Sequence, residues 1–362
     1  MNKIYNFSAG PSMLPHDVLL RAHKEFLNWN NIGSSIIEIS HRSSSFIKVA
    51  ENTENDLRDL LNIPDTYKVL FCQGGARGQF AAVPMNLLKK YQQADYVNSG
   101  YWSYNAFIES KKYCLPNLIN VVKYLKNGKK TITKFSEWKV NKKSIYIHYC
   151  PNETIEGLSI HEEPFFKNKI LVGDFSSTIL SKPIDINKYG IIYAGAQKNI
   201  GPSGITFIII KKEIIKKYSN CSPSILNYSI LDKYNSMFNT PPTFSLYLSG
   251  LVFKWLKSIG GLNKIYKINK IKANLLYDYI DKSYLYTNNI AKKNRSIMNV
   301  TFKLKNEKLN NLFIKNSVKQ GLYALKGHKI LGGMRASIYN AMPIKGVKKL
   351  IKYMNKFEKK YT

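Results

Sequence analysis

Cysteine is scarce in this sequence, and the spacing of the cysteines argues against two kinds of site. Cys72, Cys114, Cys150 and Cys221 are far apart along the 362 residues, and no two of them form a C-x-x-C pair. A disulfide framework is typical of short cysteine-dense chains, and structural zinc sites need cysteine or histidine ligands at short spacings. We therefore expect neither a disulfide framework nor a metal site.

Long hydrophobic runs are also missing. Apolar stretches such as ITFIIIKK have the length of a β-strand and are far too short to span a bilayer. The first residues, MNKIYNFSAGPSMLPHD, contain no apolar segment of signal-peptide length. The sequence thus predicts a cytoplasmic protein with no membrane partner.

Acidic residues are few, and the resulting charge needs an interpretation. Lys and Arg number 55 against 23 Asp and Glu, which gives a formal net charge of +32. The lysines are spread through the chain among many Asn, Ile and Tyr residues, with no zinc-finger spacing, RNP-type aromatic pattern or concentrated basic arm. We expect no nucleic-acid partner, although the charge favours small anionic ligands through long-range steering.

What is present is a folded α/β pattern. Hydrophobic residues make up 44% of the chain and aromatic residues 13%, which is typical of a globular protein. Strand-like runs alternate with amphipathic helical stretches from about residue 15 to residue 260. The predicted strands are 67–73, 144–150, 169–175, 190–196 and 204–210. This alternation predicts a mostly parallel sheet that is covered by helices on both faces.

A glycine pair suggests where the large domain ends. Residues 244–261 read as one helix that closes on Gly260 and Gly261. A lysine-rich helix over 262–281 follows, then a strand within 296–304 and a final amphipathic helix. We expect a large domain of residues 15–260 and a small α+β domain formed by residues 1–14 and 261–362.

One lysine stands in an unusual place. In IIYAGAQKNIGPSG (residues 191–204), Lys198 lies between two apolar runs and close to Gly195, Gly201 and Gly204. A lysine in a turn between strands is most often a solvated loop residue. Alternatively, a lysine partly withdrawn from water has a lowered pKa, and its neutral amine can attack a carbonyl carbon and form a Schiff base.

Two further features bear on Lys198. Ala76 and Arg77 follow the strand 67–73 and a glycine turn, and backbone N–H groups at such a helix start bind anions such as phosphate. Asp174 ends the strand 169–175, and ligands of open parallel sheets bind at the carboxyl ends of the strands. Each feature alone has an ordinary alternative, a common glycine turn in one case and a helix-capping aspartate in the other.

Together these features fit one cofactor. Pyridoxal 5'-phosphate needs a phosphate cradle, a carboxylate beside its pyridine nitrogen, a lysine for its carbonyl carbon and a flat group against its ring. Trp102, in a glycine turn after a strand, supplies the flat group, although a tryptophan at any one position is by default a core residue.

Longer motifs carry a resemblance. NFSAGPSMLP, EISHRS, GGARGQFAAVP, DFSSTILSKPID, YAGAQKNIGPSG, MFNTPPTFSLYLSGLVFKWL and GGMRASIYNAM resemble the phosphoserine aminotransferase family, a branch of the class-V aminotransferases, in order and over essentially the whole chain. The resemblance implies a fold-type-I pyridoxal-phosphate-dependent transferase that forms a homodimer, with its active site at the subunit boundary.

The resemblance also implies roles for individual residues. Lys198 is similar to the Schiff-base lysine, Asp174 to the partner of the pyridine nitrogen and Trp102 to the residue stacked on the ring. The other implied cofactor contacts are Ala76, Arg77, Thr154, Gln197, Asn239 and Thr240, of which the last two would come from the other subunit. The implied substrate-binding residues are His41, Arg42, His328, Lys329 and Arg335.

Two positions depart from the family pattern. Ala9 stands where some members have a serine, so a side-chain contact to substrate would be lost there. Lys329 stands where arginine is common, and lysine keeps the charge but lacks the two-pronged hydrogen-bonding geometry of a guanidinium. We expect a phosphate subsite that is retained but looser.

The implied reaction is reversible transfer of the amino group between L-glutamate and 3-phosphohydroxypyruvate, a phosphorylated 2-oxo acid. It gives O-phospho-L-serine and 2-oxoglutarate, and the resemblance also implies a parallel step on 4-phosphohydroxy-L-threonine in pyridoxine biosynthesis. One alternative is another class-V enzyme that acts on a small keto acid, such as an alanine–glyoxylate aminotransferase or a cysteine desulfurase. A desulfurase needs a cysteine in a mobile glycine- and serine-rich loop, and none of the four cysteines is in one. A basic binding protein that kept only the fold is a further alternative.

Overall fold

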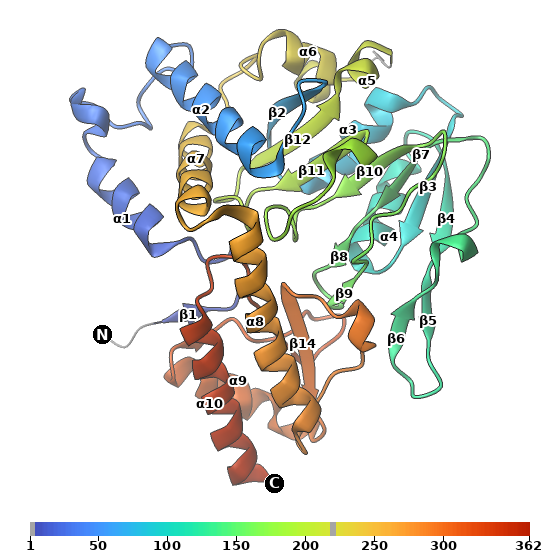
Figure 1. Cartoon of the computed structure of the whole chain (residues 1–362), viewed down its shortest axis with the longest axis vertical. Helices are drawn as coiled ribbons and strands as arrows, with labels where there is room; N and C mark the ends of the chain where they lie inside the picture. The colour runs from blue at the N-terminus through green and yellow to red at the C-terminus, as the bar shows by residue number, and fades with distance from the viewer. Residues whose placement is uncertain (1–3, 218–221) are drawn as a thin grey trace.

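A seven-stranded sheet forms the centre of the larger part of the molecule (Figure 1). The computed structural model describes residues 4–217 and 222–362. The strand order is β2 (Tyr67–Gln73), β12 (Ile205–Lys211), β11 (Ile191–Gly195), β10 (Ile170–Asp174), β7 (Ser144–Tyr149), β3 (Gln93–Asn98) and β4 (Leu115–Asn120). Strand β12 runs antiparallel to β2 and β11, and the other neighbouring pairs are parallel.

The sheet is apolar on both faces because successive side chains of a strand point to opposite sides. In β2, Val69 and Phe71 pack into one hydrophobic cluster, whereas Leu70 and Cys72 pack into another. The first cluster also contains side chains of α2 (Ser44–Leu61) and α7 (Thr243–Ser258), with α1 (His16–Glu25) beside α7. The second contains side chains of α3 (Ala76–Leu87), α4 (Tyr101–Ser110), α5 (Lys212–Lys217) and α6 (Tyr228–Lys233).

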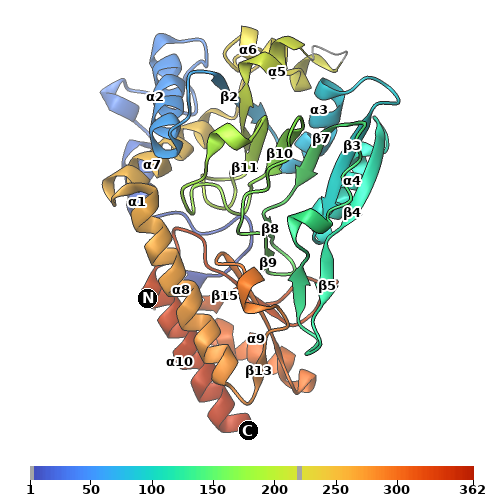
Figure 2. The same ribbon diagram turned by 45° about the vertical axis from the view of Figure 1, so that its right-hand side comes forward.

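A separate hydrophobic cluster lies at the other end of the molecule. It is built from α8 (Gly261–Lys282), α9 (Asn310–Lys319), α10 (Ile344–Tyr361) and the three-stranded sheet β13 (Tyr286–Thr287), β14 (Asn299–Leu304) and β16 (Met334–Ser337). Tyr5 and Phe7 join it, because β1 (Tyr5–Asn6) pairs with β15 (Leu322–Tyr323). Figure 2 shows α8 and α10 side by side along this cluster.

Helix α8 connects the two ends. Leu262 and Ile265 in its first turns belong to the cluster under α2 and α7, and Ala273 and Leu276 belong to the distant cluster. Two hairpins lie between the ends, β5 (Val122–Tyr124) with β6 (Lys130–Ile132) and β8 (Asn152–Glu153) with β9 (Leu158–Ser159). The division into 15–260 and 1–14 with 261–362 stays a prediction.

The α/β architecture and the mostly parallel sheet are confirmed, and the five predicted strands agree with β2, β7, β10, β11 and β12 to within one residue at each end. Trp102 differs in detail from the prediction, since it lies in the first turn of α4 and Gly100 precedes that helix.

The cysteines lie apart from one another in the described chain. Cys72, Cys114 and Cys150 are buried free thiols, and Cys221 lies outside the described residues. Across residues 4–217 and 222–362, no three His, Cys, Asp or Glu side chains gather as metal ligands would. Nor does any helix in these two stretches combine the length and the apolar character needed to cross a membrane.

Candidate active site

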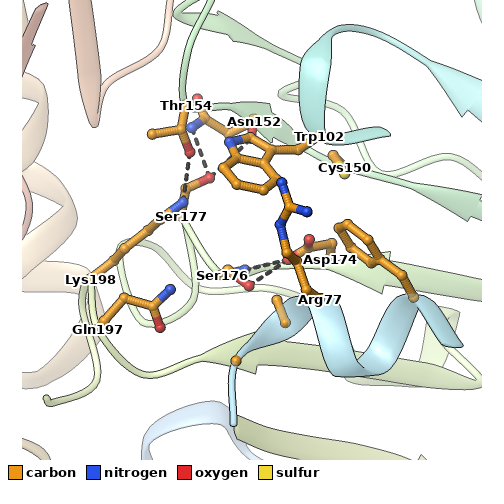
Figure 3. Close-up of a pocket in the computed structure, with 13 residues that line it drawn as sticks. Arg77, Trp102, Cys150, Asn152, Thr154, Asp174, Ser176, Ser177, Gln197 and Lys198 are labelled. Carbon is orange, nitrogen blue, oxygen red and sulfur yellow. Dashed lines mark hydrogen bonds between the residues drawn. The ribbon is translucent and has the colours of Figure 1, made fainter. Parts of the chain in front are cut away.

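A cavity of about 310 Å³ opens at the carboxyl ends of the central strands (Figure 3). It is enclosed by segments that follow β2, β7, β10 and β11 and by the first turns of α3 and α4. Its lining residues are Gly75, Ala76, Arg77, Phe80, Trp102, Cys150, Asn152, Thr154, Asp174, Ser176, Ser177, Gln197 and Lys198. This edge of an open parallel sheet is where ligands bind in α/β proteins.

Lys198 reaches into this cavity from the connection between β11 and β12. Its Nζ donates a hydrogen bond to Thr154 Oγ1 at 2.7 Å. Burial lowers the pKa of Lys198 to about 8, and Arg335 adds to this lowering while the charge of Asp174 opposes it. A lysine with this pKa has a substantial neutral fraction near neutral pH, so it is suited to attack a carbonyl carbon.

The backbone around Lys198 is fixed by the N-terminal segment. The carbonyl oxygen of Gln197 accepts from Ser12 N at 3.0 Å, and that of Lys198 accepts from the Ser12 hydroxyl at 2.5 Å. Gly10 packs so closely that an added Cβ would lie 3.3 Å from Gln197 Cγ. The lysine is therefore held in the wall of the cavity rather than in a free surface turn.

The first turn of α3 provides an anion site. Helix α3 begins at Ala76, and no side chain in the described chain caps its N-terminus at Gly75. The first N–H groups of a helix lack partners inside the helix and carry a partial positive charge, so they suit a phosphate group. Gly195 keeps the neighbouring strand clear, since a Cβ there would lie 2.8 Å from Gln197 Oε1 and 3.2 Å from Ala76 N.

Asp174 is the last residue of β10 and is buried beside the cavity. Its Oδ1 accepts from the backbone N of Ser176 at 3.0 Å and from the Ser176 hydroxyl at 2.6 Å. Burial raises the pKa of this carboxyl, and the Ser176 hydrogen bonds and Lys198 oppose the rise. A cationic group in the cavity would stabilise the ionised carboxylate, as a protonated ring nitrogen does.

Trp102 forms one side of the cavity. The Arg77 Cζ lies 5.3 Å and the Lys198 Nζ 6.0 Å from the centroid of the indole ring. Its Nε1 is buried and finds no hydrogen-bond partner within the described residues. An indole face, an uncapped helix start, a buried carboxylate and a lysine amine fit the ring, phosphate, ring nitrogen and carbonyl of pyridoxal phosphate.

A second cavity, of about 330 Å³, contains two of the predicted substrate residues. His328 and Arg335 line it together with Glu156. The His328 ring lies 5.5 Å from that of Tyr101, the residue before Trp102. Arg335 Nε is buried without a partner in the part of the chain that the structure describes, and Arg335 is close enough to lower the pKa of Lys198. Lys329, next to His328, is exposed.

Four predicted residues lie elsewhere in the chain. His41 and Arg42 are in the turn before α2, and Asn239 and Thr240 are in the segment before α7. None of the four is among the described residues that line the 310 Å³ cavity. The carbonyl oxygen of Thr240 accepts from the side chain of Gln73, shortly before the glycine turn. The roles assigned to these four residues, and to the other site residues, stay predictions.

Sequence reasoning missed several polar residues of the site. Glu153 is fully buried beside Trp102, and Asn152 Nδ2 donates to Ser177 Oγ and Asn299 Oδ1, both at 2.9 Å. Ala9 makes its contact through the backbone, since its carbonyl oxygen accepts a hydrogen bond from the Tyr339 hydroxyl at 3.0 Å. A signal was available for Glu153, since PNETIEG places two glutamates three residues apart in a chain with few acidic residues.

Comparison with known proteins gives consistent matches. The family model described as aminotransferase class-V matches residues 4–350. The phosphoserine aminotransferase of Buchnera aphidicola subsp. Schizaphis graminum is 65% identical over 361 residues, which cover 100% of both chains. That of Buchnera aphidicola subsp. Baizongia pistaciae is 56% identical over 366 residues, covering 99% of this chain and 98% of the other.

Solved structures agree with these matches. The phosphoserine aminotransferase from Bacillus circulans subsp. alkalophilus superimposes with a TM-score of 0.94 at 41% identity, covering 99% of each chain. The pyridoxal-phosphate-bound phosphoserine aminotransferase from Trichomonas vaginalis gives a TM-score of 0.91 at 36% identity, covering 98% of this chain and 100% of the other.

Proposed function

The chain belongs to the class-V aminotransferases, a family that uses pyridoxal phosphate, and we propose that it catalyses the phosphoserine aminotransferase reaction. In this reaction the amino group passes reversibly between L-glutamate and 3-phosphohydroxypyruvate, giving O-phospho-L-serine and 2-oxoglutarate. One observation carries the proposal: Lys198, Asp174, Trp102 and the uncapped start of α3 face a single cavity.

When bound, the cofactor supplies a carbonyl carbon and a ring that accepts electrons from the substrate Cα. Lys198 would hold the cofactor through Nζ, and its neutral amine would act as the general base toward the proton on the substrate Cα. The buried carboxylate of Asp174 would keep a proton on the ring nitrogen. The backbone N–H groups of Ala76 and Arg77 would hold the phosphate, and Trp102 would lie against the ring and exclude water.

The substrate carries two anionic groups, and the chain offers several cations for them. Arg335 and His328 lie beside the cofactor cavity, with Lys329 exposed next to them. We propose that the chain forms a homodimer, in which His41 and Arg42 of a second copy approach this region and Asn239 and Thr240 of that copy approach the phosphate. None of these four residues lines the described cavity of its own chain, which supports this assembly.

The compartment, the domain division and a second substrate are further parts of the proposal. The free thiols of Cys72, Cys114 and Cys150 support a reducing compartment such as the cytoplasm. The two hydrophobic clusters support a large domain of residues 15–260 and a small domain of residues 1–14 and 261–362. A parallel reaction on 4-phosphohydroxy-L-threonine is a further proposal, because that substrate has the same phosphate and amino-acid ends.

Cys150 lines the cavity, so a cysteine desulfurase activity deserves comparison. Desulfurases need a thiolate nucleophile, but burial raises the pKa of the Cys150 thiol, and the nearby carboxylates of Asp174 and Glu153 raise it further. A thiol in such surroundings stays protonated and unreactive. Cys150 therefore lines the cavity as a packing residue and does not act as a nucleophile.

Steady-state kinetics with three amino acceptors test the proposal. L-glutamate is paired in turn with 3-phosphohydroxypyruvate, unphosphorylated hydroxypyruvate and glyoxylate. We expect kcat/KM for 3-phosphohydroxypyruvate to exceed that for each unphosphorylated acceptor by about tenfold to hundredfold. The reason is that each charge-assisted hydrogen bond to the phosphate contributes about 1.5–3 kcal/mol. A preference for glyoxylate would instead favour another class-V activity on a small keto acid.

A further inference from the structure

The N-terminus of α4 is capped by two glutamates from the hairpin of β8 and β9. Glu153 Oε2 accepts from Trp102 N at 3.0 Å, and Glu153 Oε1 accepts from Ser103 N at 3.0 Å. Glu156 Oε1 accepts from Tyr101 N at 2.9 Å. The first three N–H groups of the helix that carries Trp102 are thus all bound by carboxylates that lie about fifty residues further along the chain.

This arrangement replaces an ordinary helix cap. Gly100, the residue before the helix, has no side chain that could accept these hydrogen bonds. The Ser103 hydroxyl does not cap these N–H groups either, since it accepts from Ser99 N and Gly100 N at 2.9 and 3.0 Å. The direction of Trp102 therefore depends on the position of Glu153.

The contact is tight and buried. Glu153 is 0% exposed, and the Ser99 hydroxyl donates a further hydrogen bond to its Oε1 at 3.3 Å. A Cβ added to Gly100 would lie 2.7 Å from Glu153 Cγ and from Glu156 Oε2. Burial raises the pKa of both carboxyls, that of Glu156 to about 7, so two buried acids are kept here at a cost in solvation.

The same hairpin also reaches the reactive lysine. Thr154 follows Glu153 directly and accepts the hydrogen bond from Lys198 Nζ. Neighbouring residues of this hairpin thus bind the backbone N of Trp102 and the amine of Lys198, and Figure 3 shows Thr154 and Trp102 near each other at the cavity. A shift of the hairpin would change both walls together.

We propose that Glu153 is a positioning residue that sets the indole of Trp102 against the cofactor ring, through the two backbone N–H groups at the start of α4. This inference rests on the proposed function only for the identity of the ring. Glu153 does not line the cavity, so it acts through the helix and not by touching the cofactor.

The Glu153→Gln variant tests this role. An amide offers one acceptor oxygen, so its NH₂ group would face one of the two N–H groups that Glu153 now accepts. We incorporate 5-fluorotryptophan, which labels all 4 tryptophans, and assign the Trp102 resonance with a Trp102→Phe variant. In the cofactor-free protein we expect the Trp102 ¹⁹F resonance to shift. We also expect the dissociation constant for pyridoxal phosphate to rise about tenfold, equivalent to ~1.4 kcal/mol.

Two control variants separate positioning from stability and from charge. Glu358 Oε1 accepts from Tyr284 N and Leu285 N at 2.8 and 3.1 Å, and Glu358 lies on α10, next to Phe357 of the distant hydrophobic cluster. Glu358→Gln therefore changes a carboxylate that binds two backbone N–H groups into an amide without reaching the cavity. Glu156→Gln removes a neighbouring charge but keeps an acceptor for Tyr101 N, because Glu156 Oε2 has no partner among the described residues. Neither control should move the Trp102 resonance or change cofactor binding more than about twofold.

The outcomes are distinct. An unchanged Trp102 resonance and unchanged cofactor binding in Glu153→Gln, with a lower melting temperature, would overturn the inference and leave Glu153 as a structural cap. Failure of the unmodified protein to bind pyridoxal phosphate would overturn the proposed function, and the ¹⁹F shift would still decide the role of Glu153. If Glu153→Gln does not fold, Ser99→Ala removes one hydrogen bond to Glu153. A smaller Trp102 shift in that variant supports the inference and no shift contradicts it.

Discussion

The Nζ of Lys198 lies 2.7 Å from Thr154 Oγ1 and donates a hydrogen bond to it. The two residues come from different parts of the chain, the turn after β11 of the central sheet and the turn after β8 of the β8–β9 hairpin. The contact holds a buried amine in the wall of the cavity that Trp102 and Asp174 also line. The predictions below follow from this geometry and from the charges around it.

Covalent capture of the cofactor should depend on pH through Lys198. Since burial lowers the pKa of Lys198 to about 8, the neutral amine becomes more abundant as the pH rises toward 8. We expect the rate of pyridoxal phosphate attachment to the cofactor-free protein to rise with pH and to level off above about 8, measured by borohydride trapping and intact mass.

The Lys198→Ala variant should show no trapped cofactor, and its turnover should fall by more than about a thousandfold. Trapping of the cofactor at another lysine would refute the assignment.

Asp174→Asn should slow the reaction far more than it weakens cofactor binding. The amide cannot stabilise a protonated ring nitrogen, although it can still accept from Ser176. We expect kcat to fall by at least about a hundredfold, equivalent to ~2.7 kcal/mol, with less than tenfold change in the cofactor dissociation constant. Asp185→Asn is the matched control, since Asp185 is exposed and its Oδ1 accepts from Asn187 N and Nδ2 at 3.1 and 3.2 Å. Equal kinetics in the two variants would show that Asp174 is also only a cap.

Lys329 should recognise the phosphate of the substrate. It is exposed beside His328, in the turn that leads to Arg335. We expect Lys329→Ala to raise KM for phosphoserine by about tenfold or more and KM for glutamate less, since a phosphate carries more charge than a carboxylate. Lys329→Arg should lower the phosphoserine KM severalfold. Lys326→Ala, at an exposed position in the same segment, should change neither; equal changes for both substrates would remove Lys329 from the phosphate subsite.

Lys272 should stabilise the segment that follows β16. Its buried Nζ donates to the carbonyl oxygens of Ile338, Tyr339 and Met342 at 3.0, 2.7 and 3.0 Å. Lys272→Met leaves these oxygens unpaired, so the free energy of unfolding in urea should fall by about 1–3 kcal/mol or more.

The pH dependence of stability provides a second test of Lys272. Burial lowers the pKa of Lys272 to about 7, below its usual value of 10.5. Between these values the unfolded chain binds more protons than the folded protein, so this group makes stability rise with pH from 7 to 10.5. The Met variant should lose that part of the slope. An unchanged slope would mean that Lys272 keeps its charge in the fold.

The sequence predicted the elements of the fold whose pattern is local. Strands such as Ile205–Lys211 are continuous apolar runs because both faces of the sheet are covered, and glycines mark where the chain turns beside Lys198. The reversed direction of β12 could not be read from its composition, since a buried antiparallel strand has the same residues as a buried parallel one.

The site was predicted less completely, because some of its residues act through contacts that no local pattern shows. Lys198, Asp174 and Ala76 follow or end predicted strands, and this position alone indicates a ligand site. Glu153 works through hydrogen bonds to residues about fifty positions away, and only folding brings these groups together. The two glutamates of PNETIEG are a local signal in a chain with few acidic residues, but nothing local shows which backbone N–H groups they bind.

The most direct test of the account is a half-reaction. The holoenzyme is mixed with L-glutamate alone, and then with 3-phosphohydroxypyruvate or with hydroxypyruvate. We expect about one equivalent of 2-oxoglutarate per subunit without an acceptor, because the amino group stays on the enzyme until a second substrate removes it. Continued turnover with accumulation of phosphoserine should follow only when the phosphorylated acid is added. Equal turnover with hydroxypyruvate, or no turnover with 3-phosphohydroxypyruvate, would contradict the proposed reaction.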